Sequence, residues 1–183
     1  MRISVTTPPA EYPVTTAEAR AHLGYEASVT EFDGRIDMAI AAATAMAERY
    51  TGARFVTQTV ESTWEAFCED VGVYPVNSIT SVQYYDADNS LQPFTAYTRN
   101  LVGLYPLIRP TDVWPQVYDR PDAVKYTLVV GNDAADVPSD VKAAILLRVS
   151  TLFDSPGEES SMEMTPNVLA FEALLRPHRR FTL

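Results

Sequence analysis

Residues 30–64, which read TEFDGRIDMAIAAATAMAERYTGARFVTQTVESTW, decide the fold class because two secondary-structure periods meet within them. In the first half, apolar side chains recur every three or four residues, which is the period of one helix face. Gly52 is placed to cap that helix. From Phe55 onwards β-branched and aromatic residues follow, as in a strand. The stretch therefore predicts a helix over about 30–51 that leads directly into a strand.

The same two patterns continue on either side of this stretch. Thr15 and Glu18 have the spacing of a capping box, which predicts a short helix ending near Leu23. Further strands are expected at 79–85, 94–101 and 122–130. The stretch 104–119 contains three prolines, which predicts an ordered loop with at most edge strands.

A second strong helix is expected over about 138–153. Pro138 suits the first turn of a helix, and acidic Asp140 suits its positive end. This helix is apolar nearly all round, so it must be covered on more than one side. A last short helix should begin near Pro166 and end before Pro177.

These elements predict an α+β protein with three parts. Residues 1–53 and 132–154 are expected to form a small helical bundle, and 54–131 an inserted antiparallel β unit. Residues 155–183 are expected to form an acidic linker and a C-terminal helix that serves as a docking tail.

Composition excludes several classes of function. The chain has 183 residues, of which 46% are hydrophobic and 21% charged, as in a protein that folds around a core. The longest apolar run, Met38–Ala47, is shorter than the about 20 residues that a membrane span needs. The N-terminus lacks the apolar stretch of a signal peptide. Cys68 is the single cysteine, so no intrachain disulfide is possible and a reducing compartment fits.

The formal net charge of −10 argues against binding to a nucleic-acid backbone, which requires a basic face. It still allows a surface along which DNA passes without being trapped, because like charges repel. Positive charge collects only near the C-terminus, at Arg176, Arg179 and Arg180.

No catalytic, metal or cofactor set is predicted. His22, His178 and Cys68 are too far apart in sequence for a zinc motif, and the glycines are isolated rather than clustered as in a phosphate-binding loop. The stretch 86–90 begins like a calcium loop but lacks the required later glycine and glutamate, so a hairpin turn is expected instead. The acidic residues Glu158, Glu159 and Glu163 are expected to form a solvated loop rather than paired catalytic carboxylates.

Aromatic residues leave two interpretations open. Ten tyrosines and two tryptophans could line a groove for a sugar or a peptide. They could equally form the half-buried rim of the β unit or an oligomer interface. The interface is favoured because no catalytic set accompanies the aromatic residues.

Two groups of residues are candidates for contacts with partners. The C-terminal segment combines an apolar helix face, expected to lie in an apolar groove, with basic side chains that add charge-assisted contacts. Its candidate docking residues are Phe171, Leu174, Leu175, Arg176, His178, Arg179 and Arg180. The candidate bundle or subunit interface comprises Ile36, Ile40, Tyr50, Val141, Ile145, Val149 and Leu152.

Several motifs, in their order, carry a family resemblance. They are Val14–Leu23, Tyr50–Gly52 running into 54–59, Ser78–Val82, Tyr85–Asp88, Pro121–Val124, Val137–Ile145 and Ala173–Arg180. Over about residues 14–180 the chain resembles the tailed-phage head–tail connector proteins. These are also called adaptor or head-completion proteins and occur in prophages and gene transfer agents. His178 stands where the family more often has tyrosine. The stretches 104–119 and 154–165 look particular to this chain.

The resemblance implies a structural protein of the virion neck, made in the cytoplasm of the bacterial host. Such proteins form a ring, commonly of twelve subunits, that binds the portal protein and extends the DNA channel. The ring also binds tail or stopper proteins, and genomic DNA passes through it without sequence-specific binding. The family has no catalytic residues to transfer, and no cofactor or membrane is implied. The alternatives are another tail or baseplate module that binds a protein or a glycan and, third, a hydrolase that uses scattered carboxylates.

Overall fold

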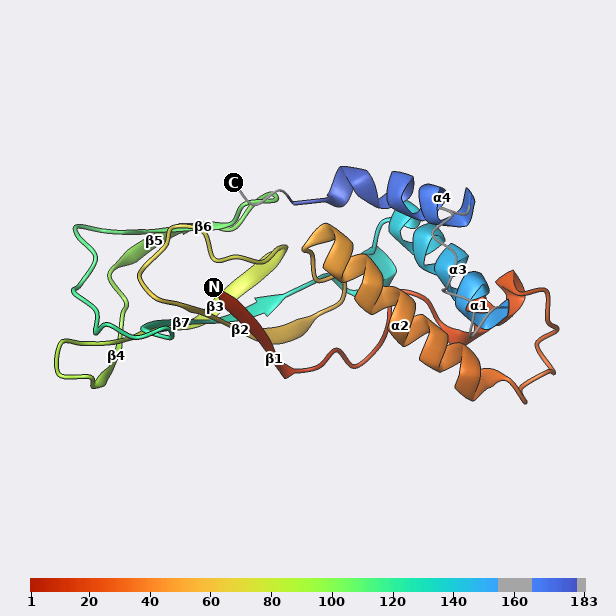
Figure 1. Cartoon of the computed structure of the whole chain (residues 1–183), viewed down its shortest axis with the longest axis horizontal. Helices are drawn as coiled ribbons and strands as arrows, with labels where there is room; N and C mark the ends of the chain where they lie inside the picture. Colours follow the sequence, from red (N-terminus) through yellow and green to blue (C-terminus); the bar gives the residue numbers. More distant parts are fainter. Residues whose placement is uncertain (155–165, 181–183) are drawn as a thin grey trace. The chain divides into compact units, whose positions relative to one another are not determined.

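The computed structural model describes residues 1–154 and 166–180, and the chain divides into two compact units. The β unit comprises Met1–Ala10 and Ala53–Asn132. The helical unit comprises Glu11–Gly52 and Asp133–Leu183. The α+β class is confirmed (Figure 1). We expected residues 1–53 to belong to the helical bundle. The structure differs at the N-terminus, where the first ten residues belong to the β unit.

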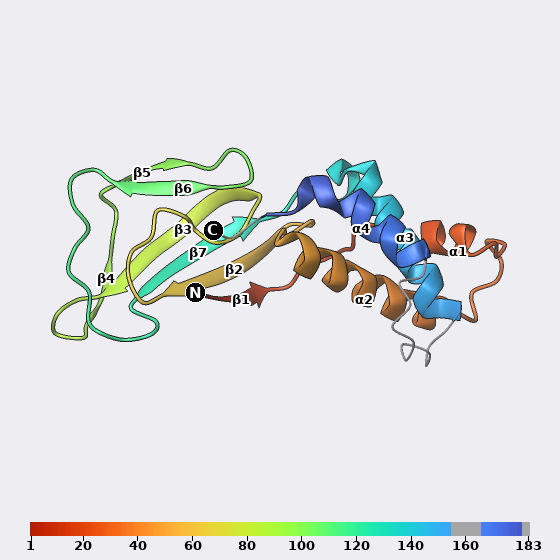
Figure 2. The same ribbon diagram turned by 45° about the horizontal axis from the view of Figure 1, so that its top comes forward.

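The described part of the helical unit contains four α-helices: α1 (Thr16–His22), α2 (Asp33–Thr51), α3 (Ser139–Asp154) and α4 (Pro166–Leu175). The two long helices begin and end within three residues of their predicted bounds. Helix α3 contacts the other three helices, and Figure 2 shows them gathered around it.

Local signals fix where the first two helices begin and end. The main-chain N–H of Glu18 donates to the Thr15 hydroxyl at 3.2 Å, and the Thr15 N–H donates to the Glu18 carboxylate at 2.7 Å, which completes the predicted capping box. The Thr15 hydroxyl also donates to the Glu18 carboxylate at 2.8 Å, and the bonds from the Thr15 N–H and hydroxyl hold the pKa of that carboxyl below its usual value. Helix α2 ends at Gly52, whose φ of +74° is accessible to glycine at little cost.

The core of the helical unit is formed where α2 and α3 face each other. Every side chain of α3 from Val141 to Phe153 is buried or half-buried, as expected for a helix that is apolar on all sides. Most of the predicted interface residues lie in this core. Ile36, Ile40, Val141, Ile145 and Val149 are at most 2% exposed.

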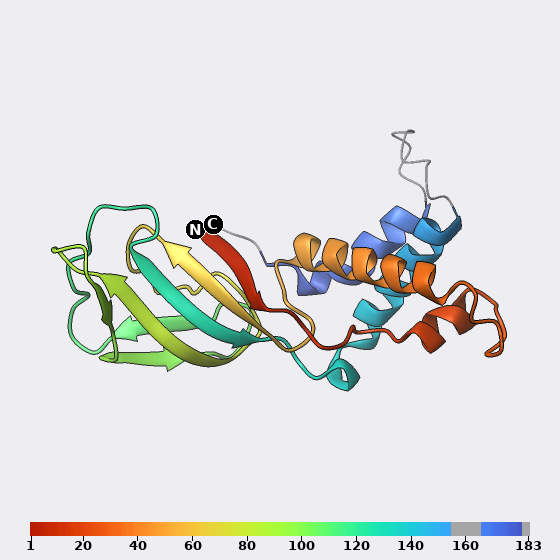
Figure 3. The same ribbon diagram turned by 90° about the horizontal axis from the view of Figure 1, so that it is seen from below.

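The β unit contains a five-stranded antiparallel sheet in the order β1-β2-β7-β3-β4, and a separate pair, β5-β6. In Figure 3 the red β1 runs beside the yellow β2. The strands are β1 (Arg2–Thr7), β2 (Gln58–Trp64), β3 (Val76–Tyr85), β4 (Leu91–Pro93), β5 (Tyr97–Asn100), β6 (Leu107–Pro110) and β7 (Val124–Val130).

One predicted strand is wrong in its pairing. The strand that returns beside β3 is β4, and not 94–101; β5 leaves the sheet and pairs with β6. The turn at 86–90 is confirmed: the Asp86 carboxylate accepts N–H groups of Asp88 and Ser90, each at 3.0 Å. These bonds, that from Ser90 above all, lower the pKa of the Asp86 carboxyl. Its oxygens are therefore used by the turn itself.

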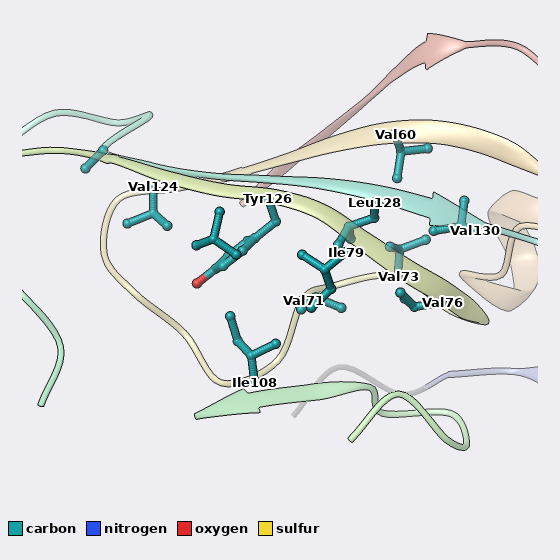
Figure 4. Packing of buried hydrophobic residues seen from close by; sticks show 12 residues of the cluster. Val60, Val71, Val73, Val76, Ile79, Ile108, Val124, Tyr126, Leu128 and Val130 are labelled. Carbon is teal, nitrogen blue, oxygen red and sulfur yellow. The ribbon is translucent and has the colours of Figure 1, made fainter. Parts of the chain in front are cut away.

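Alternating side chains of β2, β3 and β7 point to one face and form the core of the β unit (Figure 4). Tyr126 is fully buried at its centre. The Tyr126 hydroxyl donates to the Cys68 carbonyl at 3.1 Å and accepts the Cys68 N–H at 3.3 Å. Burial raises the pKa of this hydroxyl. Because both of these hydrogen bonds go to one residue, Tyr126 ties the loop after β2 to the sheet.

Candidate interaction surfaces

The C-terminal helix α4 packs within the helical unit. Phe171 is 8% exposed and Leu175 is 0% exposed, and the rings of Phe171 and Tyr50 lie 6.3 Å apart. Phe171 and Leu175 are therefore covered by α2 and α3 of their own chain, and their role as anchors on a partner stays a prediction that would need α4 to leave this position. The spacing of the apolar residues correctly indicated a buried face. It could not tell whose surface buries that face.

His178 follows α4 in a single 3₁₀ turn, η2 (Arg176–His178). Its Nε2 lies 2.8 Å from a carboxylate oxygen of Asp140 in the first turn of α3. Burial raises the pKa of Asp140, but the hydrogen bond and charge of His178 and a Val141 N–H outweigh it. The net pKa lies below the usual value, so the paired carboxylate is stabilised in its charged form.

The arginines that follow are held at the end of α2. The Arg179 guanidinium lies 5.1 Å from the centre of the Tyr50 ring, within the range of a cation–π contact. The main-chain N–H of Arg180 donates to the Thr51 carbonyl at 2.8 Å. Arg176 and Arg179 are exposed, and Leu174 is half-buried. His178 and Arg180 are half-buried as well, so five of the seven predicted docking residues remain at least partly accessible.

A groove with an apolar floor lies between α2, α3 and α4, with a volume of about 330 Å³. We call it the α2–α4 groove. Four apolar or aromatic side chains contribute to it, those of Met46, Tyr50, Val168 and Phe171. The Arg148 guanidinium lies 3.4 Å from the Met46 sulfur. Among the described residues, its lining comprises Met46, Arg49, Tyr50, Arg148, Val168, Phe171 and Glu172.

A second surface feature is the loop between β5 and β6, residues 101–106, which we call the apolar tip. Val102 is 85% exposed, Tyr105 43% and Leu104 36%. The loop has a defined conformation, because the Asn100 side-chain oxygen accepts the Val102 N–H at 3.2 Å. Gly103 takes a φ of +90°, which a side chain would disfavour. Sequence analysis missed this feature, since it expected a strand over 94–101 and an ordered loop with at most edge strands over 104–119, rather than one hairpin of β5 and β6.

The base of this hairpin is fixed to the β unit. Ile108 is 0% exposed and belongs to the core shown in Figure 4. Its N–H donates to the Glu69 carbonyl at 2.7 Å. The Arg109 guanidinium also lies 2.9 Å from the Glu69 carboxylate. The apolar tip is therefore presented on an anchored support.

Five aromatic residues of the β unit pack on one another. Phe67 stacks on Trp114 with ring centres 4.5 Å apart, and Phe94 lies 5.2 Å from Phe67. Tyr84 and Tyr97 extend the same cluster. These contacts match the half-buried rim that the sequence left open, and they give these rings a packing role.

The residues considered for chemistry stand apart from one another. Within residues 1–154 and 166–180, no three His, Cys, Asp or Glu side chains meet in a way that would hold a metal ion. In the same ranges no helix has the length and hydropathy of a membrane span. His22 is exposed and Cys68 is half-buried. Glu158, Glu159 and Glu163 lie outside the described residues.

These features describe an α+β chain that consists of a helical unit and a β unit. Each unit presents a surface suited to contact with a macromolecule. Solved structures of phage-like particles contain this fold. A chain in the neck of an empty gene transfer agent particle, computed with C6 symmetry, superposes with a TM-score of 0.80 at 18% identity. A chain in the virion of the native particle gives 0.78 at 18% identity, and one in the native neck with C12 symmetry gives 0.74 at 17%.

Each superposition covers 100% of this chain and 97% of the other. Both units therefore take part in the likeness, which shows the fold. No protein-family model and no curated protein matches the chain.

Proposed function

We propose that this protein is a structural head–tail connector of a phage-like particle, located in the virion neck and made in the host cytoplasm. Copies would form a ring beneath the portal protein, extend the DNA channel and bind tail or stopper proteins. The observation that supports this most is the full-length likeness to neck chains, which includes both units and the order of their elements. Those chains belong to necks with C6 and C12 symmetry, which is why we propose a ring, with twelve copies the first expectation.

The charge of the chain fits a channel component. A formal net charge of −10 gives a ring of copies a strongly negative field. A DNA backbone would be repelled from such a wall rather than held on it, since binding requires basic side chains that displace counterions. The proposed contact with DNA is therefore passage without sequence-specific binding.

Portal docking is assigned to the surface of the C-terminal segment. Phe171 and Leu175 are not part of this surface, because they are buried in the helical unit. Leu174, Arg176 and Arg179 remain accessible. Arginine forms bidentate hydrogen bonds with carboxylates, so an acidic surface on the portal would suit this segment.

The experiment is electron microscopy of the protein mixed with its cognate portal. We expect an added symmetric layer under the portal, which Arg176→Glu with Arg179→Glu weakens strongly. Arg99→Glu, an exposed arginine on β5, is the matched control and should leave the layer intact. Absence of the layer for the folded wild-type chain would refute the connector role. Equal layers with both variants would refute only the docking assignment.

A further inference from the structure

We propose that Asp140 and His178 are positioning residues, which hold the C-terminal segment so that Arg176 and Arg179 are already arranged when they meet the portal. The inference rests on the proposed function, because it specifies how the docking surface keeps its form. It also changes the role of His178, which sequence analysis placed among the docking residues. Here His178 acts on binding through its bond to helix α3.

The Asp140 carboxylate is itself held in place by helix α3. One of its oxygens accepts the Val141 N–H at 2.9 Å, in the first turn of the helix, where a negative charge is favoured. The other oxygen lies 2.8 Å from Nε2 of His178. The two contacts use different oxygens, so one carboxylate joins the start of α3 to a residue 38 positions further along the chain.

The pair has a defined donor and acceptor. Burial raises the pKa of Asp140, and the hydrogen bond and charge of His178 then bring it below the ordinary value, so the carboxyl is ionised at neutral pH. An ionised carboxylate only accepts hydrogen bonds, so Nε2 of His178 carries the proton. A hydrogen bond to an ionised group is stronger than one between neutral groups, which suits a contact that fixes a turn.

The bond lies between two further attachments of the C-terminal segment. Before His178, Leu175 is 0% exposed in the core of the helical unit. After it, the main-chain N–H of Arg180 donates to the Thr51 carbonyl at 2.8 Å. The Asp140–His178 bond therefore holds the intervening turn by a side chain, between a buried leucine and a main-chain bond.

The two docking arginines lie in this attached turn. Both are exposed, and the Arg179 N–H donates to the Arg176 carbonyl at 3.2 Å, so a single 3₁₀ turn sets their spacing. The Arg179 guanidinium is also oriented by the Tyr50 ring, 5.1 Å from its centre. A segment that is ordered before binding loses less conformational entropy when it binds, so its contacts contribute more fully to affinity.

Two other arrangements make different predictions. If portal binding required α4 to leave α2 and α3, the Asp140–His178 bond would oppose binding, and its removal would strengthen the complex. If His178 touched the portal directly, replacing His178 would weaken binding and replacing Asp140 would not. The three cases therefore differ in the sign of the effect or in which of the two residues produces it.

A double-mutant cycle on the pair tests the inference. Asp140→Ala, His178→Leu and the double variant are titrated against the immobilised cognate portal. We expect each single variant to weaken binding by about 3- to 10-fold, and the double variant to weaken it no more than the stronger single one. His178→Gln can offer an N–H donor in place of Nε2, so it should recover most of the binding. Asp136→Ala is the matched control: it removes the same charge at an exposed position in the 3₁₀ turn η1 (Ala134–Asp136), and it should bind like the wild type.

Hydrogen exchange supplies a readout that needs no portal. Residues 176–180 should exchange faster in Asp140→Ala and His178→Leu than in the wild type, while the centre of α2 keeps its wild-type rates. Circular dichroism identifies any variant that loses its fold. If Asp140→Ala does so, because its carboxylate also serves the first turn of α3, His178→Leu leaves that carboxylate in place and decides the test together with His178→Gln.

The outcomes separate this inference from the proposed function. Portal binding that is as strong as wild type in both single variants, or stronger, overturns the inference and leaves the connector role standing. Additive losses, or a loss with His178→Leu but not with a folded Asp140→Ala, also overturn it and assign His178 to direct contact with the portal. Weaker binding with unchanged exchange at 176–180 overturns the positioning role as well. If the folded wild type forms no layer on the portal, the connector role fails and the inference fails with it.

Discussion

Replacing Leu175 by alanine tests whether α4 is part of the helical unit in solution. Leu175 is 0% exposed, in the last turn of a helix that contacts α2 and α3. Leu169 lies on the same helix and is 51% exposed. The same substitution at the two positions therefore differs mainly in burial, which makes Leu169→Ala a matched control.

The expected loss follows from the cavity that the substitution leaves. Buried Leu→Ala changes cost about 2.7–5.0 kcal/mol, depending on how far the surroundings relax. Leu175 ends a helix of 10 residues, where relaxation is easier, so we expect the lower half of that range, about 3 kcal/mol. With a urea dependence of about 1–3 kcal/mol per molar, the midpoint should fall by about 1–3 M. Leu169→Ala should change stability by no more than about 0.5 kcal/mol.

Two optical signals follow the two units separately. Far-ultraviolet circular dichroism reports mainly on the helices. Both tryptophans, Trp64 and Trp114, lie in the β unit, so their fluorescence reports on that unit. The urea midpoint of the circular-dichroism transition is the quantity to compare between wild type and the two variants.

The reasoning would be refuted if Leu175→Ala left the circular-dichroism midpoint at the wild-type value, or lowered it no more than Leu169→Ala does. Either result would show that α4 is not packed on α2 and α3 in solution. Phe171 and Leu175 would then be available to a partner, as the sequence pattern alone had suggested.

Four further predictions concern stability. Tyr126→Phe removes the hydroxyl bonded to a loop main chain and should lower β-unit stability by about 1–3 kcal/mol in fluorescence-monitored unfolding. Gly131→Ala should cost about 2–5 kcal/mol by the same measurement, because φ is +91° and a Cβ would lie 2.2 Å from the Val56 carbonyl oxygen. Gly24→Ala, with a φ of +80° and open space, should cost only about 1–2 kcal/mol. The lowered pKa of Asp140 means that its stabilising charge is present above the ordinary pKa of 3.8 and is lost as pH falls through the lower folded value. Asp140→Asn should therefore flatten the acid limb of helical-unit stability in a pH series of urea titrations; an unchanged acid limb would show that the pairing contributes nothing.

Elements with strong local signals could be predicted from the sequence. Helix α2 has a regular apolar period and a glycine cap, and α1 has a complete capping box within four residues. Strand β1 had no such signal. Its side chains are mostly exposed, and its hydrogen bonds go to β2, more than fifty residues further on, so only the tertiary pairing identifies it.

The candidate surfaces were predictable to a smaller extent. A spacing pattern shows that a face is apolar, and it marked Phe171 and Leu175 correctly as residues that need cover. Whether the cover is the same chain or another depends on distant residues of α2 and α3. The apolar tip was not predicted, for the opposite reason. It is short, and its exposure depends on β5 pairing with β6 outside the main sheet. Turn composition does not encode that topology.

The division of each unit over two stretches of chain also has a consequence for synthesis on the ribosome. The sheet holds β1 at one edge, yet it lacks its central strand until residue 130 has been made. The helical unit is complete only when α3 and then α4 have been synthesised, up to residue 175. β1 and β2 can pair with each other early, but β2 gains its second partner only when β7 has been made, and pairing over such distances is slow. The tip is made before β7 can complete the sheet beneath it, and the groove is completed only with α4. Any contact that uses the completed groove therefore has to wait until residue 175 has been synthesised.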